Sequence, residues 1–197
     1  MKDDLPGLPC IHTLRDGTTI TIRYLGPDDR DGLRDAYRAT SARTRYLRFM
    51  YVASDLSDEM LTYLTDVDQK DHVAIVATMT SPDMKSERGV GVARFIRMKG
   101  ASDVAEVAIT VSDDMQSKGV GKALARELER LARARGIRAF RADVLGSNAT
   151  MRAILEHEGA RRIASDDASV ASYEIDLEPT EGPLQRFIRS WIRGVVA

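Results

Sequence analysis

Residues 104–135 read VAEVAITVSDDMQSKGVGKALARELERLARAR, and this succession predicts a strand, a glycine-rich loop and a helix. Residues 104–111 are short, apolar and partly β-branched, which is typical of a strand buried on both faces. Glu106 interrupts this apolar run. Because an unpaired carboxylate in apolar surroundings costs several kcal/mol, we expect Glu106 to be paired, hydrated or used in chemistry.

The predicted helix begins near Val120. Its apolar residues recur at helical spacing, and they are Val120, Leu124, Leu128, Leu131 and Ala132. The other face is polar and consists of Arg126, Glu127, Glu129, Arg130 and Arg133. Gly136 follows the basic last turn and marks the end of the helix.

The loop before this helix has the composition of an anion-binding site. Gly119 and Gly121 allow a tight turn and a close approach of the backbone to a ligand. The first N–H groups of a helix have no partner within it, and Lys118 and Lys122 add positive charge. These features predict that the loop receives phosphate oxygens. The alternative is a plain glycine turn that leads into a core helix.

Two common phosphate-binding motifs do not fit this loop. A Walker A loop requires Gly at the position of Gln116 and Ser or Thr at that of Ala123, and a dinucleotide fingerprint requires a third Gly where Leu124 stands. The pattern Gln-x-Lys-Gly-x-Gly-Lys-Ala, after a strand that carries a glutamate, instead resembles the acyl-CoA-binding motif of the GNAT superfamily of N-acyltransferases. The resemblance implies acetyl-CoA as co-substrate.

The same resemblance implies which residues hold acetyl-CoA. The pyrophosphate would lie on Gln116 and on the loop made of Ser117, Lys118, Gly119, Val120, Gly121 and Lys122. The pantetheine arm would pair with the strand backbone at Ile109, Thr110 and Val111. Asn148 stands where family members often contact the CoA arm, although it also suits an ordinary helix N-cap.

Glu106 matches the glutamate that many family members use as general base. An acceptor amine of the lysine type is mostly protonated near pH 7, so acyl transfer needs a proton acceptor. Desolvation in an apolar strand would raise the pKa of a carboxyl group toward the range in which it works as a base. The alternative for Glu106 is a strand residue that faces water at the margin of the sheet.

One position departs from the family pattern. Many GNAT enzymes have a tyrosine four residues before the glycine that ends this helix, where it protonates the leaving thiolate, and this chain has Leu155. The general acid is therefore unassigned. Water or Ser147 are the alternatives.

The remaining segments predict a mixed α/β fold of the GNAT type, with an antiparallel meander plus a parallel strand pair, flanked by helices. Strands are expected at residues 19–25, 72–79, 89–97, 104–111, 138–145, 163–164 and 170–176, and helices at residues 57–64 and 148–158 and after Pro27-Asp28-Asp29. Connections within residues 72–111 are too short for crossovers, so these strands form the meander. The strand at 138–145 follows a helix and can run parallel.

Residues 41–50 and 57–68 together resemble the acetyltransferase domain of bacterial protein-lysine acetyltransferases. The alternative for residues 41–50 is a helix and turn with Tyr46, Leu47 and Phe49 in the core and the arginines in solvent.

The expected organisation is an irregular lead-in at residues 1–18, an acetyltransferase domain at 19–178 and an amphipathic helix at 184–197. We expect this helix to dock on its own domain or on a second subunit, which would give a homodimer. Its basic face leaves membrane-surface binding as the alternative.

Composition limits the partners. The 197 residues are 43% hydrophobic and carry a net charge of −1, which gives no overall attraction to nucleic acid or membrane. Cys10 is the only cysteine, and His12, His72 and His157 lack ligand spacing, so we expect neither a disulfide nor a metal site. Without a signal-peptide pattern, a cytoplasmic location is expected.

The leading hypothesis is an acetyl-CoA-dependent N-acetyltransferase of protein lysine. A small amine, such as a polyamine, an amino acid or an antibiotic, is the alternative acceptor. A non-catalytic acyl-CoA-binding module is the competing class.

Overall fold

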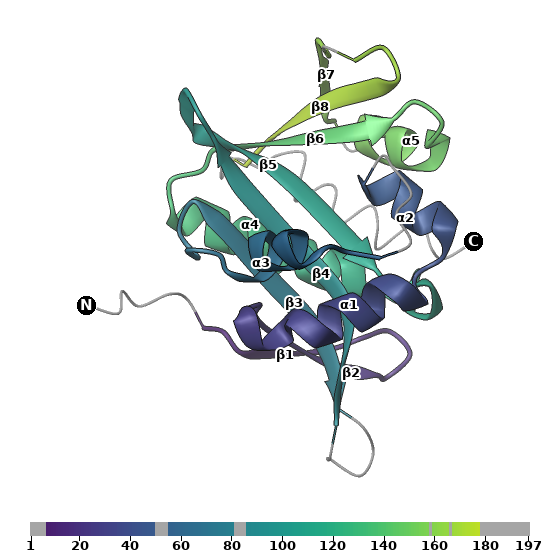
Figure 1. Cartoon of the computed structure of the whole chain (residues 1–197). Coiled ribbons are helices and arrows are strands. Elements are labelled where there is room, and N and C mark those ends of the chain that lie inside the picture. The colour runs from purple at the N-terminus through teal and green to yellow at the C-terminus, as the bar shows by residue number, and fades with distance from the viewer. Residues whose placement is uncertain (1–6, 50–54, 81–85, 158, 166, 178–197) are drawn as a thin grey trace. The chain divides into compact units, whose positions relative to one another are not determined.

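The computed structural model describes residues 7–49, 55–80, 86–157, 159–165 and 167–177 (Figure 1). The expected helix at residues 184–197 and the break at 178–183 lie outside the described residues. No helix in the described part of the chain is long and apolar enough to span a membrane.

The described strands form one eight-stranded sheet with the order β1-β2-β3-β4-β5-β6-β8-β7. In chain order they are β1 (Cys10–Thr13), β2 (Thr19–Tyr24), β3 (His72–Thr80), β4 (Glu87–Met98), β5 (Ala101–Val111), β6 (Ala139–Leu145), β7 (Arg161–Ile163) and β8 (Val170–Asp176). The pair β5 and β6 is parallel, with Val104 opposite Ala139. The mixed α/β architecture with one parallel pair is therefore confirmed.

The described helices agree with the expected ones. They are the 3-10 turns η1 (Pro27–Asp29) and η2 (Asp113–Met115) and the α-helices α1 (Arg30–Ala39), α2 (Ala42–Phe49), α3 (Asp58–Thr65), α4 (Val120–Ala134) and α5 (Ala149–His157). Ser57 caps α3, because its hydroxyl accepts a hydrogen bond from the Met60 N–H at 3.2 Å.

The chain forms two compact units, so the region expected as one domain, residues 19–178, contains parts of both. Unit 1 comprises residues 1–95 and 108–131, and unit 2 comprises residues 96–107 and 132–197. Strands β4 and β5 each contribute residues to both units.

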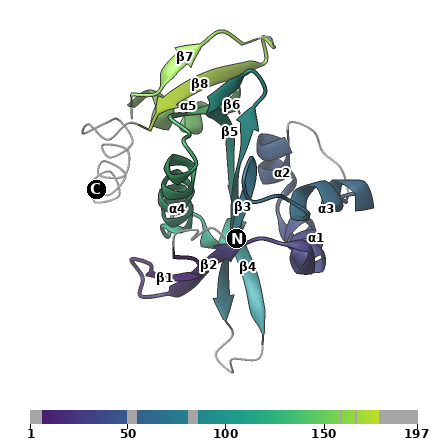
Figure 2. The same cartoon turned by 90° about the vertical axis from the view of Figure 1, so that its left-hand side faces the viewer.

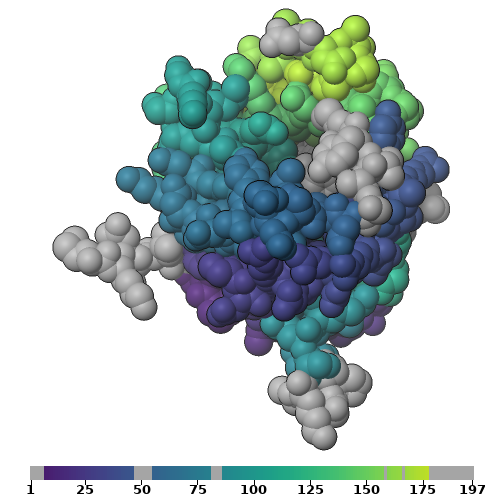
Figure 3. All heavy atoms as spheres, in the orientation of Figure 1, coloured from purple at the N-terminus to yellow at the C-terminus, as the bar shows by residue number. Residues whose placement is uncertain are grey.

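Within unit 1, α1 and α3 lie on one face of the strands and α4 lies on the other (Figure 2). A space-filling view shows the atoms of α1 and α3, in purple and blue, next to each other on the surface (Figure 3). A cluster of Tyr37, Leu56, Leu61 and Leu64 is buried under these helices. The three leucines Leu124, Leu128 and Leu131 of α4 are completely buried, as its helical periodicity predicts.

Gly91 in β4 marks the close approach of α4 to the sheet of unit 1. A Cβ atom at this position would lie 2.9 Å from Leu124 Cδ1, 3.2 Å from Val120 Cγ1 and 3.1 Å from the Thr110 carbonyl oxygen. Only a residue without a side chain fits between the two elements.

Unit 2 is built on the pairing of β6 with β8 and of β7 with β8. Tyr173 is completely buried, and its hydroxyl donates a 2.6 Å hydrogen bond to Glu156 Oε1 of α5. Arg141 Nε donates to Glu174 Oε2 at 2.9 Å.

Three expectations about local structure are wrong. The lead-in at residues 1–18 contains strand β1, which pairs with β2. Residues 104–111 are not buried on both faces, since only Ala105 among them is buried. Tyr46 is 42% exposed and does not belong to the core.

Candidate active site

The loop between β5 and α4 is shaped by two residues with left-handed backbone. Ser117 has φ of 62° and Gly119 has φ of 104°, and α4 begins directly afterwards at Val120. The first hydrogen bond into the helix runs from the Ala123 N–H to the Gly119 carbonyl at 3.0 Å. The N–H groups of the preceding positions have no acceptor within α4 and remain available to an anion.

Gln116 braces this loop. Its side-chain amide donates to the Val111 carbonyl at 3.3 Å and to Asp113 Oδ1 at 3.0 Å. The expected contact of Gln116 with a pyrophosphate therefore competes with two contacts inside the loop. The two hydrogen bonds of the Gln116 side chain fix the shape of the turn.

Asp113 ties the loop to the start of α2, a contact that the sequence does not suggest. Its carboxylate accepts hydrogen bonds from the Ser41 N–H at 2.8 Å and from the Thr44 hydroxyl at 2.7 Å. These hydrogen bonds, that of Thr44 first, lower the pKa of Asp113. The Asp113 carboxylate thus joins Gln116 of the same loop to Ser41 and Thr44, which are 72 and 69 positions away in the chain.

Positive charge gathers beside the start of α4. Burial, then the nearby charges of Arg15 and Arg126, lowers the pKa of Lys122. Lys118 Nζ lies 4.0 Å from Asp16 Oδ2, and this exposed ion pair partly offsets the charge of Lys118. Cations held close together at a helix N-terminus suit a ligand with several negative charges. The loop and its surroundings therefore fit the phosphates of an acyl-CoA.

Strand β5 supplies the other predicted site residues. Ile109 is 36% exposed, and Thr110 and Val111 are half-buried. Glu106 is exposed and lies in register with Arg141 of the parallel strand β6. The expectation that burial in an apolar strand desolvates Glu106 is wrong, because β5 exposes this position.

Asn148 and Leu155 lie in unit 2. Asn148 caps α5, since its Oδ1 accepts a hydrogen bond from the Met151 N–H at 3.2 Å, as predicted from the sequence. Leu155 is buried in the core of this unit. It fills space and offers no proton to a leaving group.

A cavity of about 630 Å³ lies in unit 1 on the side of β5 that carries Thr110 and Ser112. Arg45 also lines it and donates to the carbonyls of Thr40 at 2.9 Å and Tyr37 at 3.3 Å. Arg45 Nε is buried and has no partner among the described residues. The arginine-rich composition of residues 41–50 was the only sequence signal for this residue.

Comparison with known proteins gives a consistent family. A model described as the Acetyltransferase (GNAT) family matches residues 34–160. Acetyltransferase Pat of Mycolicibacterium smegmatis is 33% identical over 172 residues, which are 85% of this chain and 49% of Pat. Acetyltransferase PA5475 of Pseudomonas aeruginosa is 30% identical, over 72% of this chain and 75% of the relative. The chain spans about half the length of Pat.

Solved structures agree. The GNAT domain of S. lividans PAT superposes with a TM-score of 0.76 at 30% identity, covering 85% of this chain and 96% of that domain. A cAMP-binding acyltransferase from Mycobacterium smegmatis gives a TM-score of 0.58 at 29% identity, covering 96% of this chain and 56% of that protein.

Proposed function

Because the chain belongs to the GNAT acetyltransferase family, we propose that it transfers the acetyl group of acetyl-CoA to a primary amine, and that this amine is the side chain of a protein lysine. The observation that carries the proposal is the left-handed backbone at Ser117 and Gly119, which presents the first N–H groups of α4. The similarity to Pat supports the choice of a protein acceptor.

Acetyl-CoA, when bound, supplies an acetyl thioester. Residues 116–122, which form the loop and the first turn of α4, would hold its phosphates through backbone N–H groups, with Lys118 and Lys122 adding charge. The backbone at residues 109–111 would orient the acyl arm along β5. Asn148 would contact the arm in addition to capping α5.

Glu106 is the proposed general base. An exposed carboxylate on β5 is accessible to an incoming ammonium group, which must lose a proton before its nitrogen can attack. Within unit 1, Ala108 and Thr110 of β5 line the cavity. We assign the cavity to the acceptor side chain.

The group that protonates the departing thiolate is water or Ser147. Leu155 is excluded by its hydrocarbon side chain and its burial. Ser147 is exposed in the turn before α5.

Buried Leu155 also supports a second candidate, a module that binds acyl-CoA without catalysis. A coupled assay of CoA release distinguishes the two, with acetyl-CoA as donor and lysine peptides, polyamines or free amino acids as acceptors. Acetylated lysine peptide, identified by mass spectrometry, would support the main proposal. Turnover only with small amines would favour the alternative acceptors. Acetyl-CoA binding by calorimetry without turnover on any amine would favour the module.

A further inference from the structure

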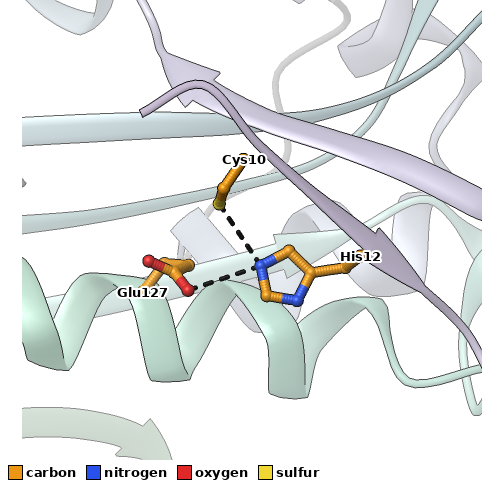
Figure 4. A group of neighbouring side chains, drawn as sticks. All are labelled: Cys10, His12 and Glu127. Carbon is orange, nitrogen blue, oxygen red and sulfur yellow. Dashed lines mark hydrogen bonds and ion pairs between the residues drawn. The ribbon is translucent and has the colours of Figure 1, made fainter. Parts of the chain in front are cut away.

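Cys10, His12 and Glu127 converge between β1 and α4 in unit 1 (Figure 4). Cys10 Sγ lies 3.3 Å from His12 Nε2, and Glu127 Oε1 lies 3.4 Å from the same nitrogen. All three donor atoms lie within 4.8 Å of one another. The site is independent of the proposed acyl transfer.

Strand β1 turns Cys10 and His12 inward. Ile11, between the two donors, is 73% exposed, whereas Cys10 and His12 are half-buried. Their cross-strand neighbours Ile22 and Ile20 are buried. A strand that only had to cover the sheet would place its isoleucine inside, so the orientation favours a role for the thiol and the imidazole.

The geometry differs from that of an activated cysteine. In a nucleophile–base–carboxylate arrangement, one imidazole nitrogen faces the nucleophile and the opposite nitrogen is held by the carboxylate. Here the thiol and the carboxylate both face Nε2 of His12 (Figure 4). A neutral imidazole nitrogen carries either one proton or one lone pair, so it cannot serve both partners well. Convergence on one point is instead the arrangement of ligands around a cation.

The distances match a tetrahedral zinc site. With Zn–S of about 2.3 Å and Zn–N and Zn–O of about 2.0–2.1 Å, tetrahedral angles place S and N about 3.5 Å apart and N and O about 3.4 Å apart. The observed separations of 3.3 and 3.4 Å are close to these values. The S–O separation would be about 3.6 Å. Because the observed separation is at most 4.8 Å, the two atoms would have to approach by at most about 1.2 Å.

The carboxylate is already oriented. Glu127 is 8% exposed, and Arg130 donates to its Oε2 at 2.9 Å from Nε and 2.7 Å from Nη2. The other oxygen, Oε1, faces His12. A partner that fixes one oxygen of a ligating carboxylate and leaves the other toward the metal is common in such sites.

We propose that Cys10, His12 and Glu127 bind one zinc ion with a water as fourth ligand, and that this ion fastens the β1–β2 hairpin to α4. Thiolate, imidazole and carboxylate together select zinc over magnesium or calcium. On binding, the S–H bond breaks, the proton passes to solvent and sulfur bonds to zinc.

The test uses the full chain, stripped with a chelator and then titrated with Zn²⁺ in competition with a chromophoric chelator, and in parallel with Co²⁺. We expect one equivalent of either metal, a rise in Tm with Zn²⁺, and a thiolate-to-cobalt charge-transfer band together with the visible bands of tetrahedral cobalt. Cys10→Ser should abolish the charge-transfer band. Cys10→Ser and His12→Gln should each weaken Zn²⁺ binding by more than about 100-fold, which exceeds the effect typical of residues that only hydrogen-bond to a metal ligand.

His157→Gln is the matched control, because His157 is exposed on α5 and outside the cluster. It should leave stoichiometry, affinity and spectra unchanged. Circular dichroism of the metal-free variants checks that they are folded. The proposal is overturned if the wild-type chain shows no thiolate-to-cobalt band. It is also overturned if both single variants, Cys10→Ser and His12→Gln, bind Zn²⁺ as tightly as wild type. The cobalt spectrum is recorded on the wild-type chain, so this test does not depend on whether a variant folds.

Discussion

Glu106 on strand β5 and Glu127 on helix α4 are carboxylates that differ in their exposure to solvent. Glu106 is exposed, with Arg141 as its neighbour in register on the next strand. Glu127 is 8% exposed and is held by Arg130 and His12. An exposed carboxylate can meet a passing substrate, whereas a buried and paired one can act only on the groups fixed around it. The first arrangement suits turnover and the second suits structure.

The largest expected effect tests the exposed side of this comparison. Glu106→Gln keeps the shape but removes the proton acceptor, so turnover should fall by about 10²–10⁴-fold at neutral pH while acetyl-CoA affinity is retained. The loss should shrink at high pH, where free amine is abundant. The measurement is kcat/KM against pH. Asp103→Asn, also exposed on β5, is the control and should change little.

A structural role for Glu106 predicts parallel pH profiles for the variant and wild type, separated by less than about tenfold. That gap is only ~1.4 kcal/mol and could come from a small shift of the strand. Such a result would remove Glu106 from the mechanism and with it the contrast with Glu127.

The second prediction concerns the first turn of α4. Gly121→Asp brings a side chain and a negative charge to the proposed pyrophosphate site, so acetyl-CoA affinity should fall by about 10–100-fold, or roughly 1.4–2.7 kcal/mol. Gly121→Ala separates bulk from charge and should have the smaller effect. Calorimetry on folded protein is the measurement. Unchanged affinity in the aspartate variant would place the phosphates elsewhere.

The third prediction tests the buried side. In chelator-treated protein, Glu127→Gln leaves Arg130 and His12 without their anion and should lower the free energy of unfolding by about 1–3 kcal/mol. Glu106→Gln, as the exposed counterpart, should stay within about 0.5 kcal/mol of wild type. Urea unfolding compares them directly. Equal losses in the free energy of unfolding would mean that the burial of Glu127 gives it no larger role in stability than Glu106 has.

The smallest effect extends the contrast to two histidines. Burial, then the charge of Arg94, lowers the pKa of His72 to about 4. The unfolded chain therefore takes up a proton first as pH falls below about 6.5, and stability decreases until His72 itself is protonated near pH 4. Because His72 is only half-buried, we expect a loss of about 1–2 kcal/mol rather than the full value of the shift.

His72→Gln should remove that part of the pH dependence, and His157→Gln should not, since His157 is exposed. Thermal melts between pH 7 and 5 give the comparison. If both variants keep the wild-type slope, His72 is not the group responsible.

What the sequence could predict follows from how far apart the interacting residues are. The strand, loop and helix of residues 104–135 carry their signals within a few positions, and so does the Asn148 cap. The order of the meander and the parallel pair follow from connection length. Left-handed Ser117 was not evident, because a serine rarely adopts this backbone.

The remaining features depend on distant partners. β1 has four residues in a segment rich in proline and glycine, and it exists as a strand because Cys10 pairs with Ile22. Helical periodicity assigns Glu127 to a polar face, but it cannot reveal that β1 covers that face. The hydrogen bonds of Asp113 with Ser41 and Thr44 could not be predicted either, since no sequence pattern connects these three residues.

Gly91 has a consequence for how this chain can vary. The atoms around a would-be Cβ include the Thr110 carbonyl oxygen at 3.1 Å, and backbone cannot rotate away as a side chain can. Even alanine would require the Leu124 side chain to move and the Thr110 carbonyl to shift by about a few tenths of an ångström. In a library that offers all twenty amino acids at position 91, selection for folded protein should return glycine almost alone, whereas position 89, where the nearest atom is 3.8 Å away, should accept small residues. The two neighbouring glycines would then drift at different rates among descendants of this sequence.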